Sequence, residues 1–279
     1  MTRPLALTKS LHAMWALAAV IGASTTQAAT QPMGAQGSLD ARIQAVRNGT
    51  IRFTLAASPF VCGTGSSWYR SRDGRSGSFY GNWNSISTRE VETTCDRGPV
   101  RIVVVREDGD TKSLRHYVGG KWVANDTVKD FGAIGAIEGG TWLLRQAEQA
   151  TDKVARTAMN AAILVDSTAP GPTLLRMVKD DSRSRDVRNS AVHWLGEVVG
   201  DRVTATLDSI AYESGDREIR RAAIMAMSRR PKEEAIPALQ KWAESLPDRE
   251  LRRTAIMALA QTRDTLAIAW LEKRMNASR

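Results

Sequence analysis

The chain has 279 residues, a quarter of them charged, and a formal net charge of +9. A basic excess can indicate an anionic partner such as nucleic acid, anionic lipid or a cell-wall polymer, but here arginine outnumbers lysine and is scattered among acids, as a GC-rich genome would also produce. Two cysteines and three histidines are too few for a typical metal centre, so no metal and no cofactor are expected.

Residues 1–28 have the composition of a secretory signal peptide. Arg3 and Lys9 precede an apolar stretch over residues 15–23, and the chain is small and polar up to Ala28. That stretch is shorter than the about 20 residues needed to cross a bilayer, so we expect cleavage after Ala28 and a periplasmic or secreted chain without a transmembrane segment. An uncleaved anchor is the alternative, and residues 29–38 are expected to be a disordered start.

Residues 39–130 have the pattern of a small β-rich domain. Apolar and polar residues alternate around Ile51, Phe53 and Leu55, as in a half-buried strand. Two later runs, over residues 100–106 and 112–118, are separated by a turn that contains Asp108 and Gly109, a hairpin signal. The expected structure is a small antiparallel sheet.

Cys62 and Cys95 are the two cysteines of the chain. In an oxidising compartment an even pair is most simply a disulfide, and two reduced buried thiols are the alternative. Aromatic residues and arginines alternate between them, which suits binding of anions, sugars or single-stranded nucleic acid, although the Gly and Ser content is equally typical of a surface loop. The candidate binding residues in this stretch are Trp68, Tyr69, Arg70, Arg72 and Arg75.

Residues 131–140 contain four glycines. Their spacing does not match a dinucleotide-binding loop. We therefore interpret this segment as a flexible junction before a C-terminal region that covers residues 141–279.

A repeat of 32 or 33 residues fills that region. The segment Asp216-Arg-Glu-Ile-Arg-Arg-Ala-Ala-Ile-Met-Ala-Met recurs as Asp248-Arg-Glu-Leu-Arg-Arg-Thr-Ala-Ile-Met-Ala-Leu, and weaker copies begin at Ser184 and Thr151. All four starting residues are good helix N-caps, and leucines at equal spacing predict a second helix in each unit. Two-helix units stack into a solenoid because one unit cannot bury its own apolar face. The expected units lie near residues 151–183, 184–215, 216–247 and 248–279.

The pattern Asp216-x-x-Ile219-Arg220-x-x-Ala223, repeated from Asp248, resembles the signature of HEAT-like repeats, the type also found in phycobilin lyases. The resemblance covers residues 151–275 and implies an α-solenoid, so the expected fold class is α+β, with the β domain preceding the helices. It also implies that the Asp and Arg of the motif join neighbouring repeats. The residues given structural roles in this way are Arg188, Asp216, Arg220, Asp248 and Arg252.

Motifs of common enzymes are absent from the sequence, including the Gly-x-Ser-x-Gly elbow, the phosphate-binding loop and His-Glu-x-x-His. His116 lies in a predicted strand, and His193 matches Met225 and Met257 in the repeat register. Both histidines are interpreted as structural, and no catalytic residue is expected.

The expected function is that of an exported, non-catalytic scaffold that binds another protein, because solenoids present extended surfaces to partners. Arg221 and Arg253 are the candidate binding residues on the repeats. The resemblance to lyase-type repeats leaves an accessory or lyase-like enzyme as the alternative. A nucleic-acid binder with a basic helix face is a third reading; export disfavours it, so no nucleic acid is expected as a partner.

Overall fold

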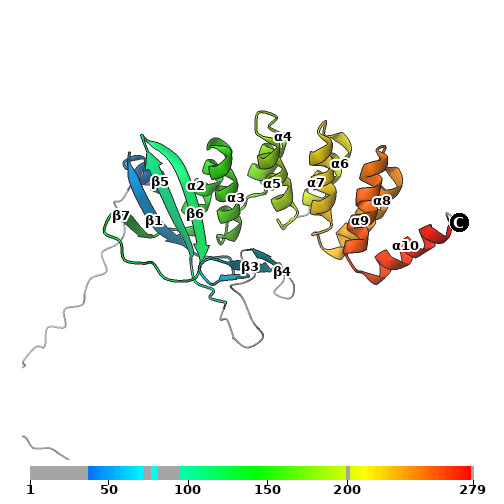
Figure 1. The fold of residues 1–279 in the computed structure, drawn as a ribbon, viewed down its shortest axis with the longest axis horizontal. Coiled ribbons are helices and arrows are strands. Elements are labelled where there is room, and N and C mark those ends of the chain that lie inside the picture. Colours follow the sequence, from blue (N-terminus) through cyan, green and yellow to red (C-terminus); the bar gives the residue numbers. More distant parts are fainter. Residues whose placement is uncertain (1–36, 72–76, 81–94, 199–201, 278–279) are drawn as a thin grey trace, which may run out of the picture. The chain divides into compact units, whose positions relative to one another are not determined.

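The computed structural model describes residues 37–71, 77–80, 95–198 and 202–277 (Figure 1). The expected leader and all but the last two residues of the expected disordered start lie outside the described residues, and residues 37–279 form one compact unit. Within that unit, one short helix and the strands come first and a row of helices follows (Figure 1), which confirms the α+β fold class.

The main sheet has four strands in the order β6–β5–β1–β7. They are β1 (Gly49–Leu55), β5 (Val100–Glu107), β6 (Asp110–Val118) and β7 (Val128–Ala133). The β5–β6 hairpin turns through Asp108 and Gly109, both with positive φ, as a tight hairpin turn requires. The sheet is not wholly antiparallel, because β7 runs parallel to β1.

A second, smaller sheet contains β2 (Val61–Gly63), β3 (Trp68–Ser71) and β4 (Gly77–Tyr80), paired antiparallel in that order. A disulfide joins Cys62 of β2 to Cys95. The backbone of Gly63 also pairs with that of Asp96. The expected disulfide-stapled β region is therefore present, and neither cysteine is a free thiol.

Helix α3 (Asp152–Leu164) packs against β5 and β6 of the main sheet. Helix α2 (Ala136–Gln149) contacts β1, and α1 (Leu39–Gln44), which the sequence pattern does not predict, packs on α2. Phe53 of β1 meets Trp142 of α2 edge to face, with ring centroids 5.9 Å apart. Gly139 and Gly140 lie inside α2, where an added Cβ would collide with Leu55 and with Thr168 respectively. These glycines therefore allow close packing of the helix.

The remaining helices form the repeats (Figure 1). The first helices of successive units are α3, α5, α7 and α9, which pack side by side, and each is followed by a second helix. Buried leucines of the second helices, such as Leu207 and Leu239, are fully enclosed. The bounds are α3 (Asp152–Leu164), α4 (Gly171–Lys179), α5 (Arg185–Leu195), α6 (Arg202–Glu213), α7 (Arg217–Met227), α8 (Lys232–Ser245), α9 (Arg249–Gln261) and α10 (Thr265–Ala277).

One apolar core continues from the main sheet into the repeats, from Leu39 to Ala267. The inner face of the sheet, with Ile51, Phe53 and Ile102 fully buried, covers α2 and α3 at the start of the row. A solenoid needs its end covered, since each unit relies on a neighbour to bury its apolar side. The sheet therefore serves as the cap of the repeats at their N-terminal end.

Candidate interaction surface

The exposed side chains of the first helices recur at repeat spacing on one face. Arg221 of α7 and Arg253 of α9 occupy equivalent positions and both are exposed. The Arg221 side chain is 62% exposed and lies 4.0 Å from the nearest carboxylate, that of Glu218. Both arginines line a shallow hollow of about 310 Å³, together with Glu250 and Met257. The structure therefore brings these two candidate binding residues together.

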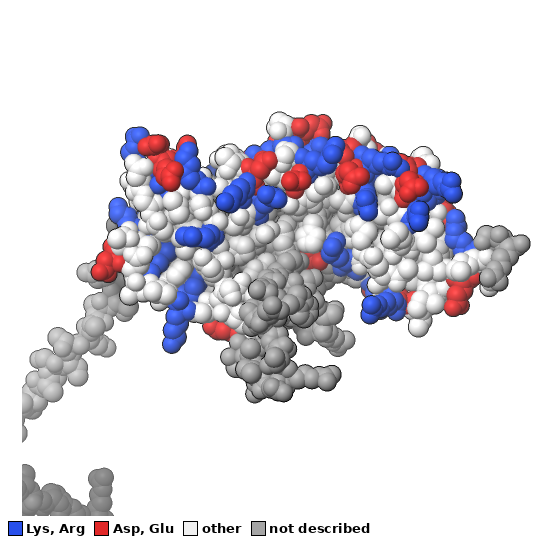
Figure 2. Space-filling model, viewed as in Figure 1, with Lys and Arg blue, Asp and Glu red and all other residues white. Residues whose placement is uncertain are grey.

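Methionines occupy the next turn of the same face. Met225 of α7 and Met257 of α9 occupy equivalent positions in the repeat, and His193 occupies this position in α5. Met257 is 55% exposed. A methionine side chain is flexible and polarisable, so it adapts to different partner surfaces. Figure 2 shows that the surface over α7 and α9 is largely uncharged below its upper rim.

The upper rim itself is a band of alternating charge (Figure 2), located where the first helices begin. Arg185 and Arg188 of one unit both contact Asp216 of the next, at 3.0 and 3.1 Å. Arg217 contacts Asp248 at 2.9 Å in the same way. These charges are used in joining repeats, so the band is a structural feature.

The aspartates of this band also cap helices. Asp216 accepts a hydrogen bond from the amide of Glu218, and Asp248 accepts from the amides of Glu250 and Leu251. Burial by itself raises the pKa of Asp216, but the hydrogen bonds from Arg185 and from the helix amides outweigh it and lower the pKa overall. The carboxylate is therefore held in its charged form.

The motif arginines also link neighbouring units, but by two kinds of contact. Arg188 pairs with Asp216, whereas Arg220 donates to the carbonyl of Ala211 at 2.8 Å and Arg252 donates to that of Pro247 at 2.9 Å. In the unit that begins at Asp216, the link to the next aspartate is made by Arg217, which the motif does not single out and which is equivalent to Arg185 of the preceding unit. Arg217 stands in the first turn of α7, nearer the next aspartate.

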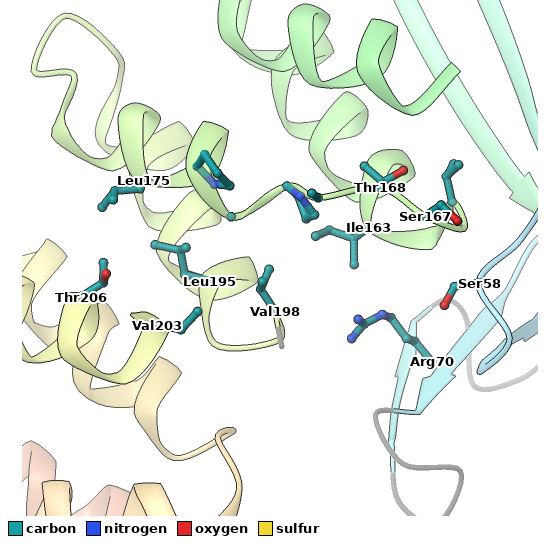
Figure 3. Close-up of a pocket in the computed structure, with 15 residues that line it drawn as sticks. Ser58, Arg70, Ile163, Ser167, Thr168, Leu175, Leu195, Val198, Val203 and Thr206 are labelled. Atoms are coloured by element: carbon teal, nitrogen blue, oxygen red, sulfur yellow. The ribbon is translucent and has the colours of Figure 1, made fainter. Parts of the chain in front are cut away.

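A larger cleft of about 730 Å³ lies between the second sheet and helices α3 to α6. Figure 3 shows Ile163, Leu195 and Val203 on its helical side and Arg70 of β3 reaching in from the opposite side. The walls are mostly apolar. Among the described candidate residues of the cysteine-flanked stretch, Arg70 is thus the one that lines this cleft.

Arg70 is held by a buried acid that sequence reasoning missed. Its Nη1 atom lies 3.4 Å from Glu197 Oε2, and Arg229 approaches the other oxygen of the same carboxylate at 3.9 Å. Glu197 is only 8% exposed, which the sequence does not reveal because Glu197 simply follows α5. The cluster joins the second sheet to two repeats.

The neighbours of Arg70 have different surroundings. Trp68 is 7% exposed and stacks on Trp194 of α5, with ring centroids 6.3 Å apart, so it packs the second sheet on the helices. Tyr69 is half-buried. Arg72 and Arg75 lie outside the described residues.

The two histidines of the described chain are half-buried. Burial lowers the pKa of His116 to about 4, and burial together with the charge of Arg229 lowers the pKa of His193 to about 4. Among the described residues, no three His, Cys, Asp or Glu side chains are grouped as a metal ion would require. No helix in the described ranges is long and apolar enough to cross a membrane.

The geometry defines the class of protein as an α-solenoid with a β-sheet cap. Residues 204–279 match the family model for HEAT repeats. This match and the helical pairs that precede it support a HEAT-like repeat architecture for the C-terminal region. HEAT repeats suggest a protein-interaction or scaffold role and are generally non-catalytic. A comparison with curated proteins finds no match.

Proposed function

We propose that the protein is an exported, non-catalytic scaffold that binds another protein on the exposed face of α7 and α9. The observation that carries the proposal is the recurrence of Arg221 and Arg253, with Met257 beside them, outside the ion pairs that join the repeats. Exposed arginine and methionine side chains are enriched at protein interfaces. Arg70 at the 730 Å³ cleft offers a second contact.

The composition of this face favours a protein partner over nucleic acid. Glu218 and Glu250 line the same hollow as Arg221 and Arg253. The third arginine of the lining, Arg217, is paired with Asp248, so the hollow has little cationic excess. A surface that binds a phosphate backbone needs a cationic excess. Mixed charge around an apolar Met257 instead fits the polar rim and apolar centre of a protein interface.

Two observations support export. The N-terminal 28 residues have a signal-peptide composition, and Cys62 is bonded to Cys95, as is typical of oxidising compartments. The N-terminal sequence of protein purified from a cell envelope fraction tests this point. We expect it to begin after Ala28; an intact leader on a cytosolic protein with reduced cysteines would contradict export.

The binding face is tested by a pull-down from envelope extract with the full chain as bait. The variant Arg221→Glu/Arg253→Glu reverses two charges on the proposed face. Lys179→Glu/Lys273→Glu is the matched control, because it makes the same change in net charge at exposed sites on second helices. We expect the first variant to retain less than a tenth of the partner, since a like-charge contact at an interface costs several kcal/mol, and the control to retain it.

The pull-down has two contradicting outcomes. Equal retention by both variants would remove the binding site from α7 and α9. Equal loss by both would show that net charge, and not the proposed face, determines capture. Circular dichroism of each variant checks that the helices are intact.

A further inference from the structure

The outer face of the main sheet is hollowed. A pocket of about 460 Å³ lies between this face and the segment that follows β6, residues 119–127. Val103 of β5 and Tyr117 of β6 contribute to its lining, and their neighbours along each strand point to the opposite, buried face. The hollow therefore lies on the side of the sheet away from the helices.

The charged residues that line the hollow are all cationic. Its lining contains the cationic residues Arg52, Arg101, Arg115 and Lys121 and no Asp or Glu. An acid just outside it, Asp130, pairs with Arg52 at 2.7 Å. Arg115 and Lys121 are exposed and have no ion pair within the described part of the chain. The hollow thus holds more positive charge than the neighbouring carboxylate offsets.

The wall of the hollow is fixed in place. Two guanidinium groups lie over the ring of Trp122, that of Arg52 at 5.2 Å and that of Arg101 at 5.1 Å from the ring centroid. Arg101 also donates to the carbonyl of Gly119 at 2.9 Å, and Arg52 donates to that of Val123 at 2.9 Å. Cation–π contacts and hydrogen bonds together hold this segment on the sheet, so a ligand would meet a site formed in advance.

The partners of Arg101 matter for its charge. Its guanidinium donates to carbonyl groups, which are neutral. Its charge helps Arg52 to lower the pKa of Asp130, but the described residues give Arg101 no ion pair of its own. Together with Arg115 on the adjacent strand and Lys121 on the overlying segment, it provides three cations from three separate elements around one hollow.

We propose that this hollow binds an acidic segment of a partner protein. Carboxylates of the segment contact Arg101, Arg115 and Lys121, and its apolar side chains contact Val103 and Tyr117. Planar guanidinium groups match carboxylates well. This site goes beyond the proposed function, because it lies on the sheet and uses none of the residues of α7 and α9.

Two other anionic partners fit less well. A phosphodiester or polyphosphate chain carries charge but offers nothing to the apolar part of the lining, where Val103, Ala124 and Val128 lie. A flat membrane surface meets protruding side chains and does not fill a hollow. Polyphosphate and anionic lipid vesicles therefore serve as competing ligands.

The test measures fluorescence anisotropy of a labelled ten-residue peptide of alternating Glu and Val, titrated with the full chain. We expect saturable binding that weakens as salt rises, because the contacts are between exposed charges. Arg115→Glu/Lys121→Glu should weaken binding at least tenfold. The conservative exchange Arg115→Lys/Lys121→Arg keeps both charges and should stay within threefold of the original affinity.

The matched control is Lys112→Glu/Lys129→Glu. It makes the same change in net charge at exposed residues of β6 and β7 that do not line the hollow, and it should change the affinity less than twofold. Equal weakening by the control would overturn the site. No saturable peptide binding, or tighter binding of polyphosphate or of phosphatidylglycerol vesicles than of the peptide, would overturn the assignment of an acidic protein segment.

Discussion

Gly196 ends α5 in direct contact with the main chain of α7. A Cβ added at Gly196 would lie 2.6 Å from the carbonyl oxygen of Ala226 and 3.1 Å from its carbonyl carbon, whereas ordinary contacts begin at 3.4 Å. The obstructing atoms are main chain inside a helix and cannot rotate away, so the two helices must separate by about 0.8 Å. Overpacking of this kind costs about 1–3 kcal/mol. We expect Gly196→Ala to lower the free energy of unfolding by about 2 kcal/mol.

The backbone of Gly196 makes this a test of packing alone. Its φ is −60° and ψ is −24°, a conformation that alanine adopts readily. Gly215→Ala is the matched control, because nothing lies within 4 Å of the added Cβ and the backbone is outside the left-handed region. It should be neutral or stabilise by about 0.4–1 kcal/mol.

Urea unfolding followed by far-ultraviolet circular dichroism measures both variants against the parent protein. The free energy of unfolding of Gly196→Ala should be lower than that of the parent protein, and that of Gly215→Ala should be equal to or higher than that of the parent. If Gly196→Ala were as stable as Gly215→Ala, the close approach of α5 and α7 would be refuted.

Three further predictions concern stability. Asp216→Ala removes a helix cap and the shared partner of Arg185 and Arg188, so thermal unfolding should show a loss of about 1 kcal/mol. Burial lowers the pKa of His116 from 6.5 to about 4 in the folded chain, so the unfolded chain takes up a proton at this residue first as the pH falls. The free energy of unfolding should therefore drop by about 3 kcal/mol between pH 6.5 and pH 4. The urea midpoint of His116→Gln should depend less steeply on pH in that window. Reduction of the Cys62–Cys95 disulfide, whose cysteines are 33 positions apart, should lower the free energy of unfolding by about 4 kcal/mol. The double exchange Cys62→Ser/Cys95→Ser should abolish the response to reductant. An unchanged melting point on reduction would contradict a stabilising disulfide.

The repeats could be predicted from the sequence because their signals are local and recur. N-cap residues Ser184, Asp216 and Asp248 each accept from the first turn of the helix that follows. Thr151 departs from this pattern, since its side chain makes no cap hydrogen bond. Even so, α3 begins at the next residue, because apolar burial sets its position as well.

The β region was only partly predictable. The strands around Phe53 and the Asp108–Gly109 hairpin have short-range signals, and both are present. The parallel pairing of β7 with β1 joins residues more than 70 positions apart, so no local pattern predicts it. Gly139 allows α2 to pack closely on Leu55. From the sequence alone, a glycine that serves close packing looks the same as a glycine of a flexible junction.

The candidate site was likewise predictable from the sequence only in part. Helical periodicity predicts that Arg221 and Arg253 share an exposed face, and they line one hollow. The contact between Arg70 and Glu197 could not be predicted, because it depends on the second sheet meeting the end of α5. The hollow around Arg115 likewise exists only once the segment after β6 folds over the sheet.

We propose that a partner protein occupies the exposed face of α7 and α9. Site-specific photo-crosslinking tests it most directly, with the photoreactive residue introduced at Met257 and, as the control, at exposed Glu233 on α8. A discrete crosslinked protein that forms from position 257, is absent from position 233 and disappears in the Arg221→Glu/Arg253→Glu background is the result we predict. Crosslinks of equal yield from both positions, or from position 233 alone, would contradict the account.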